Sequence, residues 1–308
     1  MPIPVIDGDE LRRLLPVEAA IDALEAAFRE RDATADPLRT RLDTSAGQLL
    51  LMPASGPQGV GVKLVTLTEA NPARGLPFVN AVYVLFDGRT QSPSAMMDGA
   101  ALTALRTAAV SGLATRFLAR EDAHRLVVFG AGVQARAHVD AMRAVRPIRE
   151  LVVVSRTHGR AQALADEAGQ AGLEARTGPA EDVAEADIVC TCTTAGEPLF
   201  DGALVRPGTH LNAVGAYEAH RRELDSGLVR RSQVVVETRE VALAEAGEIA
   251  IAIREGVIED SHIAADLGEL VRGVQVRGGP RDVTLFKSVG MAFEDLVVAR
   301  AVVDRAGA

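Results

Sequence analysis

The 308-residue sequence predicts an α/β protein in which a domain built on a parallel sheet is inserted into an α+β domain. From residue 120 to 280, apolar strand-like runs alternate with helix-like segments, which is typical of a parallel sheet. The first third carries short strand-like runs separated by turn residues, which is typical of an antiparallel sheet. The chain closes with a helical segment at 288–305. We therefore expect one domain from residues 1–119 plus 281–308 and a second from 120–280.

The first third begins with an amphipathic helix and continues with strands. Residues 16–31 carry apolar side chains at helical spacing, and residues 32–37 break that pattern. Strand-like runs follow at residues 49–52, 60–67 and 79–86. Pro53 is expected to end the first of these strands, and Asp87-Gly88 the last. An Ala-rich helix at 99–118 then leads into the inserted domain.

In the inserted domain, strands and helices are expected in alternation. The strands are expected at residues 125–128, 151–154, 174–176, 188–193, 210–214 and 234–237. The helices are expected at residues 134–145 and 160–171, with a short helix before the last strand.

The composition excludes several classes of partner. Lys and Arg number 33 against 42 Asp and Glu, so the net charge of −9 argues against nucleic acid. Aromatic residues make up 3% of the chain, which leaves few platforms for stacked bases. No apolar stretch approaches the roughly 18–20 residues of a membrane span, and the first residues lack the layout of a signal peptide. We expect a cytoplasmic protein that binds neither nucleic acid nor membranes. Cys190 and Cys192 lack neighbouring ligand residues, so no metal site is expected.

The most specific motif is a turn, Gly130-Ala131-Gly132-Val133-Gln134-Ala135, that follows an apolar strand and begins a helix. Gly130 and Gly132 leave no side chain between the backbone and a pyrophosphate, and Ala135 lets the helix lie close to the sheet. The free N–H groups at the start of that helix favour a bound phosphate. This pattern predicts a dinucleotide site of the Rossmann type, formed by Gly130, Ala131, Gly132, Val133 and Gln134.

The end of the next strand indicates which dinucleotide is bound. An NAD site usually has an acidic residue there that holds the ribose 2′-hydroxyl, whereas this chain has Ser155-Arg156-Thr157. A cation beside two hydroxyls suits a 2′-phosphate. The sequence therefore predicts that NADP(H) is preferred over NAD(H), with Ser155, Arg156 and Thr157 at the phosphate.

Lys63 lies in a strand that is apolar on both faces, which predicts that both faces are covered. A lysine at such a position requires an anion or a water-filled cleft, because an unpaired buried cation is strongly disfavoured. The alternative is a lysine whose stem follows apolar surface while its ammonium reaches water.

Arg106 is the only positively charged residue from position 99 to 115, on an otherwise apolar helix. Its planar guanidinium is suited to bidentate recognition of a carboxylate. The alternative is a structural ion pair with an acidic residue from elsewhere. Arg39 lies in loop-like sequence, where a solvated arginine is the default. If these two arginines and Lys63 converge, they would bind a small carboxylic acid.

The chain resembles the ornithine cyclodeaminase/μ-crystallin family over nearly its whole length. The matching stretches, in the order and spacing of the family, are PLRT (37–40), LMPA (51–54), VKLVT (62–66), MDG (97–99), LRTAA (105–109), GAGVQA (130–135), NAVGA (212–216), REL (222–224) and FKSVGMA (286–292). The family comprises cyclodeaminases, alanine and other amino-acid dehydrogenases, and reductases of cyclic ketimines.

The resemblance implies a homodimer formed through the sheet of the outer domain. It also implies that Arg39, Lys63 and Arg106 bind the substrate carboxylate near the nicotinamide, so that Lys63 and Arg106 belong to the catalytic machinery. Five further residues are implied near the cofactor or the cleft, namely Thr191, Thr193, Val214, Lys287 and Ser288.

One position departs from the cyclodeaminases of the family. They carry a catalytic Asp where this chain has Tyr217. A phenol, with a pKa of about 10, is a poor base for the amine attack that closes a ring, but it can donate a proton to a developing amine. Tyr217 is therefore a candidate catalytic residue, and the alternative is that it only lines the pocket. Ala219 replaces a proline found in many members, and Glu218 and His220 are weaker catalytic candidates.

The sequence thus predicts an NADPH-dependent reductase of cyclic 2-imino carboxylates, of the Δ1-pyrroline-2-carboxylate or Δ1-piperideine-2-carboxylate type. One alternative is an amino-acid dehydrogenase that acts on an open-chain 2-oxo acid, as alanine dehydrogenase does. A second is an ornithine cyclodeaminase, which Tyr217 disfavours. A third is a non-catalytic protein that binds NADPH or a small ligand, against which the retention of Lys63 and Arg106 argues.

Overall fold

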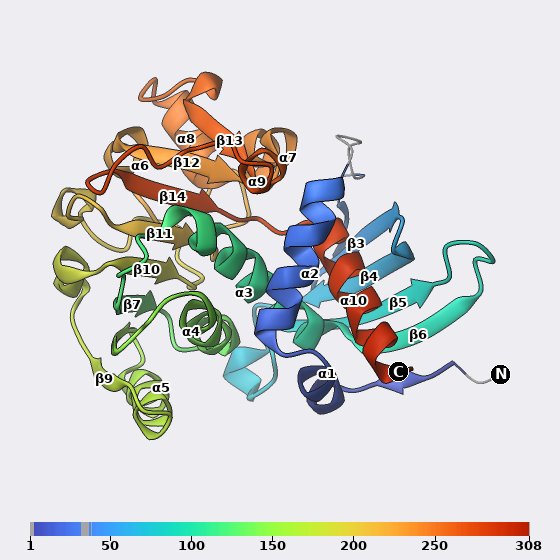
Figure 1. Cartoon of the computed structure of the whole chain (residues 1–308). Coiled ribbons are helices and arrows are strands. Elements are labelled where there is room, and N and C mark those ends of the chain that lie inside the picture. The colour runs from blue at the N-terminus through green and yellow to red at the C-terminus, as the bar shows by residue number, and fades with distance from the viewer. Residues whose placement is uncertain (1–2, 32–36, 38, 308) are drawn as a thin grey trace. The chain divides into compact units, whose positions relative to one another are not determined.

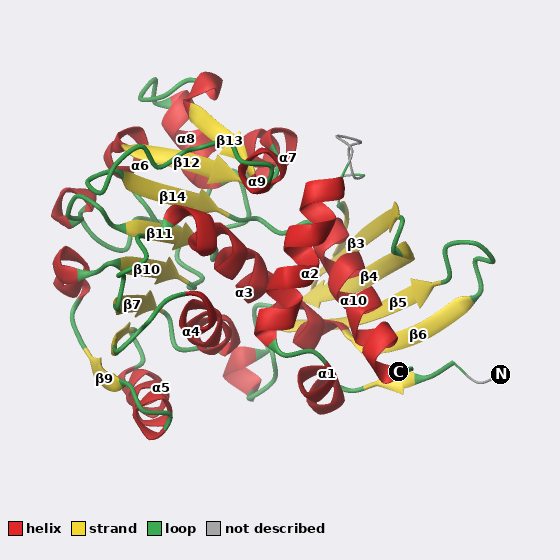
Figure 2. Cartoon of the chain, viewed as in Figure 1, coloured by secondary structure: helices red, strands yellow, loops and turns green. Residues whose placement is uncertain are grey.

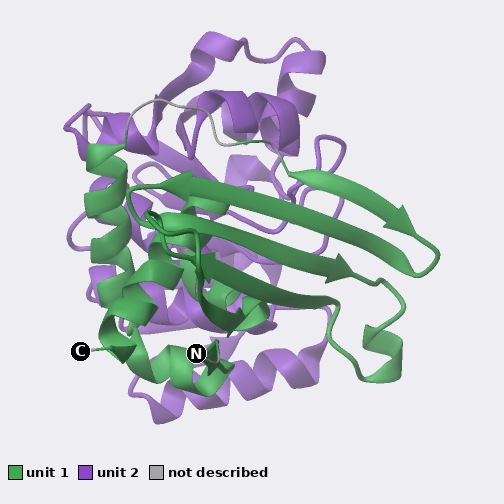
Figure 3. Cartoon of the chain, turned by 90° about the vertical axis from the view of Figure 1, so that its right-hand side faces the viewer, with its two compact units in different colours: residues 1–106, 291–308 green, residues 107–290 purple. Residues whose placement is uncertain are grey.

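The computed structural model describes residues 3–31, 37 and 39–307, and divides into two compact units (Figure 3). Unit 1 comprises Met1–Arg106 with Met291–Ala308, and unit 2 comprises Thr107–Gly290. The inserted unit is longer at both ends than the predicted 120–280, because it takes in the second half of one helix and one more strand. Leu38, in the PLRT stretch, lies outside the described residues.

Unit 1 contains a six-stranded sheet in the order β1-β6-β5-β4-β3-β2 (Figure 1). Its strands are β1 (Val5–Ile6), β2 (Thr40–Thr44), β3 (Gly47–Gly56), β4 (Gly59–Leu67), β5 (Val79–Phe86) and β6 (Pro93–Asp98). Neighbouring strands are antiparallel except for β1 and β6, which are parallel. The predicted antiparallel sheet is confirmed.

The helices of unit 1 come from both ends of the chain. They are α1 (Gly8–Leu14), α2 (Val17–Glu30), the first turns of α3 (Gly99–Leu118), and α10 (Ala292–Ala306), with a 3₁₀ turn at Pro72–Arg74. Helix α10 packs against α2 and against β3, β4 and β5 (Figure 2). Along β4 the alternate residues Gly61, Lys63 and Val65 are buried, whereas Val62 and Leu64 are only half-buried. The side chain of Lys63 therefore lies on the more deeply buried face of this sheet.

Pro53 does not end its strand, contrary to the prediction. Strand β3 continues to Gly56, and Pro53 pairs with Val62 of β4. The reason lies on the other side of β3, where β2 pairs only as far as Leu51. Among the described residues Pro53 has no strand partner on that side, so its missing N–H breaks no described ladder.

Unit 2 is built on an eight-stranded parallel sheet in the order β13-β12-β14-β11-β10-β7-β8-β9. Its strands are β7 (Arg125–Phe129), β8 (Glu150–Val154), β9 (Glu174–Thr177), β10 (Ile188–Thr191), β11 (His210–Ala213), β12 (Ser232–Val236), β13 (Ile263–Asp266) and β14 (Val283–Lys287). The chain proceeds outward from β7 in both directions, through β8 to one edge and through β10 to the other. This is the doubly wound arrangement of a Rossmann domain, so the predicted fold class is confirmed.

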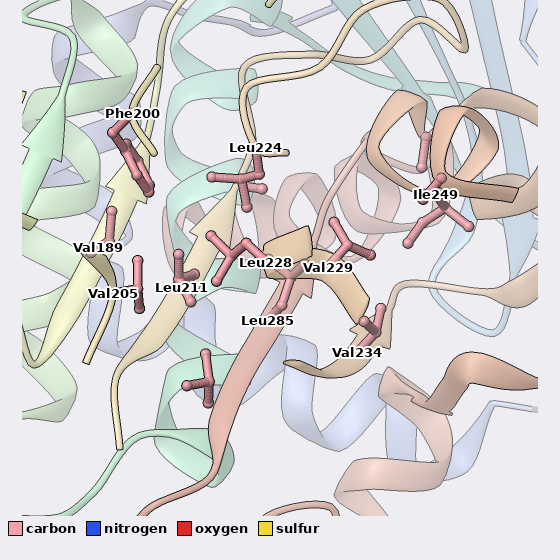
Figure 4. Packing of buried hydrophobic residues seen from close by; sticks show 14 of the residues in the cluster. Val189, Phe200, Val205, Leu211, Leu224, Leu228, Val229, Val234, Ile249 and Leu285 are labelled. Carbon is pink, nitrogen blue, oxygen red and sulfur yellow. The ribbon is translucent and has the colours of Figure 1, made fainter. Parts of the chain in front are cut away.

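The helices of unit 2 include those that the sequence predicted beside β7 and β8. They are the remainder of α3, α4 (Val133–Val145), α5 (His158–Gln170), α6 (Ser226–Arg231), α7 (Arg239–Glu245), α8 (Gly247–Arg254) and α9 (Leu267–Val271), with 3₁₀ turns at Ala180–Glu185, Gly202–Leu204 and Asp260–His262. Figure 4 shows part of the core of this unit. Val189, Leu211 and Leu285 come from neighbouring strands and belong to one buried cluster with Leu228 of α6 and Ile249 of α8.

Among the described residues, none of the helices is both long and apolar enough to span a bilayer.

Candidate active site

Arg106 lies on α3, about two turns after the helix begins. Asp98 caps this helix, because its Oδ1 accepts hydrogen bonds from the backbone N–H groups of Ala100 and Ala101 at 2.9 and 3.0 Å. Gly99 lies so close to β5 that a Cβ would be 2.8 Å from the carbonyl carbon of Ala81. The start of α3, and with it the place of Arg106, is thus set by Asp98 and Gly99.

Lys63, at the centre of β4, is 1% exposed. Its Nζ donates to Oδ1 of Asp295 at 2.9 Å and to Oδ2 at 2.7 Å. The ammonium therefore does not reach the surface. The anion that a buried lysine requires is supplied by α10.

Arg106 contacts the same turn of α10. Its Nη1 donates to Oε2 of Glu294 at 2.8 Å, and its Nε lies 3.3 Å from Oδ1 of Asp295. The ion pair that the sequence left as an alternative for Arg106 is therefore present. A single oxygen, Oδ1 of Asp295, contacts both Lys63 and Arg106.

The charge of Lys63 is set by its surroundings within unit 1. Burial lowers the pKa of Lys63 to about 8, the carboxylate of Asp295 opposes this shift, and the charges of Arg106 and Arg39 reinforce it. Arg39, half-buried immediately before β2, is thus close enough to act on Lys63. The three cations named from the sequence are brought together in one unit.

Sequence reasoning missed three groups beside these cations. Glu294 and Asp295 are both 0% exposed on an otherwise apolar helix face, which is the same signal that singled out Arg106. Tyr83 lies on β5 directly opposite Lys63 and is fully buried, and burial together with the charge of Asp295 raises its pKa. Its hydroxyl has no hydrogen-bond partner in the described part of the chain.

The predicted dinucleotide turn lies in unit 2, at the carboxyl end of β7. Gly130 has φ +105°, and a Cβ there would be 2.5 Å from the carbonyl oxygen of Cys192, so this position requires glycine. At Gly132 a Cβ would meet no described atom within 4 Å. Helix α4 begins at Val133, and its N-cap is Gly132, which has no side chain to cap the helix. Open space in front of the positive end of a helix fits a pyrophosphate.

Ser155, Arg156 and Thr157 follow β8, the neighbour of β7 in the sheet. The backbone N–H of Thr157 donates to Oγ of Ser155 at 3.3 Å. Arg156 is exposed, and no ion pair joins it to another described residue. The residues present at the carboxyl ends of β7 and β8 therefore fit an NAD(P) molecule.

The remaining predicted cofactor residues surround buried carboxylates at the carboxyl ends of β10, β11 and β14. Glu223 accepts hydrogen bonds from the hydroxyls of Thr191 and Thr193, both at 2.7 Å. Burial raises the pKa of Glu223, and the charge of Lys287 opposes this shift. The N–H of Val214, on the loop beyond β11, donates to the carbonyl of Thr191 at 3.1 Å.

Lys287 and Ser288 also contact buried carboxylates. Nζ of Lys287 lies 2.8 Å from Oε2 of Glu248, and Oγ of Ser288 donates to Oε1 of Glu237 at 2.7 Å. The sequence pointed to the donors of these pairs but missed the acceptors. Lys287 thus joins β14 to α8, and Ser288 joins the end of β14 to the end of β12, each through a buried carboxylate.

Tyr217 lies in the loop beyond β11. It is half-buried and packs against the hydrophobic core of unit 2. Both roles named from the sequence for Tyr217, a proton donor and a residue that only lines the pocket, stay predictions.

The sequence matches the profile of the ornithine cyclodeaminase/mu-crystallin family over residues 7–308. A Δ1-pyrroline-2-carboxylate reductase of Bacillus cereus is 36% identical over 313 residues, which cover 98% of this chain and 96% of the relative.

Two solved structures have the same fold over nearly the whole chain. The Thermococcus litoralis Δ1-pyrroline-2-carboxylate reductase in complex with NADH and L-proline has a TM-score of 0.94 and 39% identity, and covers 99% of this chain and 97% of its own. An archaeal alanine dehydrogenase dimer with bound NAD has a TM-score of 0.93 and 32% identity, with coverage of 99% and 96%.

Proposed function

Because the chain belongs to the ornithine cyclodeaminase/mu-crystallin family, we propose that it is an NADPH-dependent reductase of cyclic 2-imino carboxylates. Its substrates are of the Δ1-pyrroline-2-carboxylate or Δ1-piperideine-2-carboxylate type, and its products are cyclic α-amino acids. The observation that carries this proposal is the buried cluster of Lys63 and Arg106 with Arg39 nearby, which suits a small carboxylate. Two of the proteins compared above are Δ1-pyrroline-2-carboxylate reductases, which supports the imine class.

In this proposal the residues of unit 1 bind and orient the substrate. Arg106 binds the carboxylate, and Lys63 and Arg39 add positive charge beside it. The reduced nicotinamide, when bound, supplies the hydride. Tyr217 or an ordered water donates a proton to the nitrogen as the C=N bond becomes CH–NH. A cyclic imine is easily protonated near neutral pH and is then electrophilic, so orientation accounts for most of the catalysis.

We propose further that NADP(H) is preferred over NAD(H). The support for this preference is the exposed Arg156 between two hydroxyl residues, with no acidic residue at the end of β8. The two solved structures named above hold NADH and NAD, so the proposed preference rests on this chain's own residues after β8 and is tested below through Arg156.

The same site allows a second function, an amino-acid dehydrogenase that acts on an open-chain 2-oxo acid and an amine. The likeness to the archaeal alanine dehydrogenase favours it. An ornithine cyclodeaminase ranks lower because Tyr217 stands where a carboxylate base is needed. A non-catalytic ligand-binding role ranks lowest, because ligand storage does not require Lys63 and Arg106 to be buried together.

We propose that the protein is a cytoplasmic homodimer. The support is the second face of the unit 1 sheet, where apolar side chains are only half-buried, namely Leu49, Leu51, Val62, Leu64, Val82 and Val84. The archaeal alanine dehydrogenase is a dimer, which agrees with this proposal.

Assays of NADPH oxidation, measured by absorbance with a panel of imino, oxo and amino acids, test the proposed reaction. We expect oxidation of NADPH with Δ1-pyrroline-2-carboxylate and its six-membered homologue, and no release of ammonia from ornithine. Faster turnover of pyruvate with ammonium would favour the dehydrogenase. Ammonia from ornithine with catalytic NAD would assign a cyclodeaminase, and tight NADPH binding without turnover of any substrate would assign the binding protein.

A further inference from the structure

Asp295 has a place in unit 1 that the proposed function does not yet explain. It is 0% exposed, and its carboxylate contacts both cations of the cluster. Both oxygens accept from Nζ of Lys63, and one of them also lies 3.3 Å from Nε of Arg106. The neighbouring Glu294 contacts only Arg106 of these two cations, through Nη1. Asp295 is therefore the group that joins Lys63 to Arg106.

We propose that Asp295 is a positioning residue, which holds Lys63 and Arg106 side by side and keeps Lys63 protonated so that both cations bind one substrate carboxylate. This inference rests on the proposed function, because it assumes that the cluster binds a carboxylate. Asp295 acts through Lys63 and Arg106, and touches the substrate in no step of the proposal.

Like charges surround Lys63 and repel its ammonium. Lys63 has Arg106 and Arg39 as cationic neighbours, and burial also disfavours its charged form. Around the ammonium are Asp295 from α10, Arg106 from α3, Arg39 before β2, and the neutral phenol of Tyr83 from β5. Of these groups, Asp295 alone carries a negative charge, and Glu294 lies against Arg106. If the charge of Asp295 is removed, burial and the charges of Arg106 and Arg39 remain, and all three favour the neutral amine of Lys63.

The direction of the pH effect follows from this balance. The pKa of Lys63 is about 8 with Asp295 in place, so Lys63 is protonated below this value and loses its charge above it. If the charged form binds the carboxylate, kcat/KM for a cyclic imine falls as the pH rises through about 8. Without the charge of Asp295 the pKa of Lys63 falls further, and the same decline moves to lower pH.

The variant Asp295→Asn tests the inference, because an amide keeps the shape of the side chain and removes its charge. We expect the decline of kcat/KM at alkaline pH to move down by about one pH unit or more, so that activity at pH 8 falls at least about fivefold while activity at pH 6 changes less. The loss should appear mainly in KM, and the affinity for NADPH should stay unchanged. If the alkaline decline of kcat/KM stays at the same pH while the melting temperature drops, Asp295 has a merely structural role and the inference is overturned.

The control is Asp187→Asn in unit 2. Asp187 is likewise buried and lies 2.7 and 2.6 Å from Arg120 and Arg206, but it belongs to neither proposed binding site. This variant should lose stability and keep the wild-type pH profile. If Asp295→Asn does not fold, Asp295→Glu decides instead. This variant keeps the negative charge but displaces it by one methylene. The alkaline decline of kcat/KM should therefore stay near pH 8 while KM rises at least threefold. An unchanged KM would overturn the inference.

A binding measurement separates this inference from the proposed reaction. Pyrrole-2-carboxylate is planar, carries one carboxylate and has no C=N bond to reduce. Calorimetric titration into the wild-type protein with NADP⁺ should show affinity that declines above about pH 8, and Asp295→Asn should move that decline to lower pH. If this holds while no imine is reduced, the positioning role stands and the proposed reaction fails. If imines are reduced but Asp295→Asn leaves the pH dependence of both kcat/KM and ligand binding unchanged, the proposed reaction stands and the positioning role fails. A wild-type protein that neither binds pyrrole-2-carboxylate nor reduces an imine overturns both proposals.

Discussion

At the scale of single residues, the cluster around Lys63 shows how far charge can be anticipated from sequence. The apolar surroundings of Lys63 and Arg106 were sufficient to single out both residues as candidates for burial beside an anion, and both are buried. Their partners could not be predicted, because Asp295 lies 232 positions from Lys63 and only the packing of α10 onto β4 joins them. Local pattern identifies a charge that needs a partner, whereas the identity of the partner is a property of the tertiary fold.

The substitution Arg106→Ala should reduce kcat/KM for cyclic imines well over tenfold. Removal of one member of a buried charge pair commonly costs about 2–5 kcal/mol, and here Glu294 would also lose the Nη1 contact. Arg106→Lys should lose a similar factor, because an ammonium cannot reproduce the planar guanidinium. Steady-state kinetics and fluorescence titration of NADPH check this, and the affinity for NADPH should stay nearly unchanged. A folded Arg106→Ala variant with full activity would assign Arg106 to structure alone.

The substitution Arg156→Ala should narrow the preference for NADPH. We expect the wild-type protein to bind NADPH at least about tenfold more tightly than NADH. The reason is that Arg156 donates a charge-assisted hydrogen bond to the 2′-phosphate, which NADH lacks. The variant should lose affinity for NADPH and keep its affinity for NADH. Dissociation constants from titrations with both cofactors test this. Equal binding of the two by the wild-type protein would be the contrary result.

At the scale of elements, the sequence predicted the strands and helices that carry long or regular apolar patterns. Helix α3 begins and ends where predicted, and β5 does as well. Strand β14 was missed because only a short apolar run lies between Thr284 and Lys287, although all five of its residues are buried. Its polar residues find partners at long range, Thr284 with His210 and Lys287 with Glu248. A strand at the centre of a parallel sheet can thus look like a loop when neighbours satisfy its polar groups.

Tyr83 of β5 occupies the space that a side chain at Gly61 of β4 would need. A Cβ at Gly61 would lie 2.0 Å from the hydroxyl oxygen of Tyr83, so Gly61→Ala should destabilise the protein by about 1–3 kcal/mol through overpacking. In a Tyr83→Val background the same substitution should be neutral or stabilising, because glycine inside a strand is entropically costly. Chemical denaturation of the four proteins in this cycle measures the coupling. Equal effects of Gly61→Ala in both backgrounds would contradict the contact.

At the scale of the whole molecule, the two-domain organisation was predicted and its boundaries were not. The predicted first boundary, after residue 119, followed the end of the Ala-rich helix, but α3 belongs to both units, which divide at Arg106. Pattern alone does not reveal this division, because the helix is apolar on every side and continues without a break. The second boundary shifted for a related reason, since the unrecognised β14 completes the sheet of unit 2.

The oligomeric state should depend on the half-buried face of the unit 1 sheet. Leu64 lies on this face between Leu51 of β3 and Val82 of β5, so a charge there would meet apolar neighbours on both sides. We expect the wild type to sediment as a dimer and Leu64→Glu to sediment as a monomer, because desolvating a carboxylate in an apolar interface is strongly unfavourable. Ala163→Glu, an exposed position on α5, adds the same charge elsewhere and should leave the dimer intact. Binding of NADPH, which depends on unit 2, should survive in both variants and shows that they are folded. A Leu64→Glu protein with the mass of the wild-type dimer would place the subunit contact on another surface.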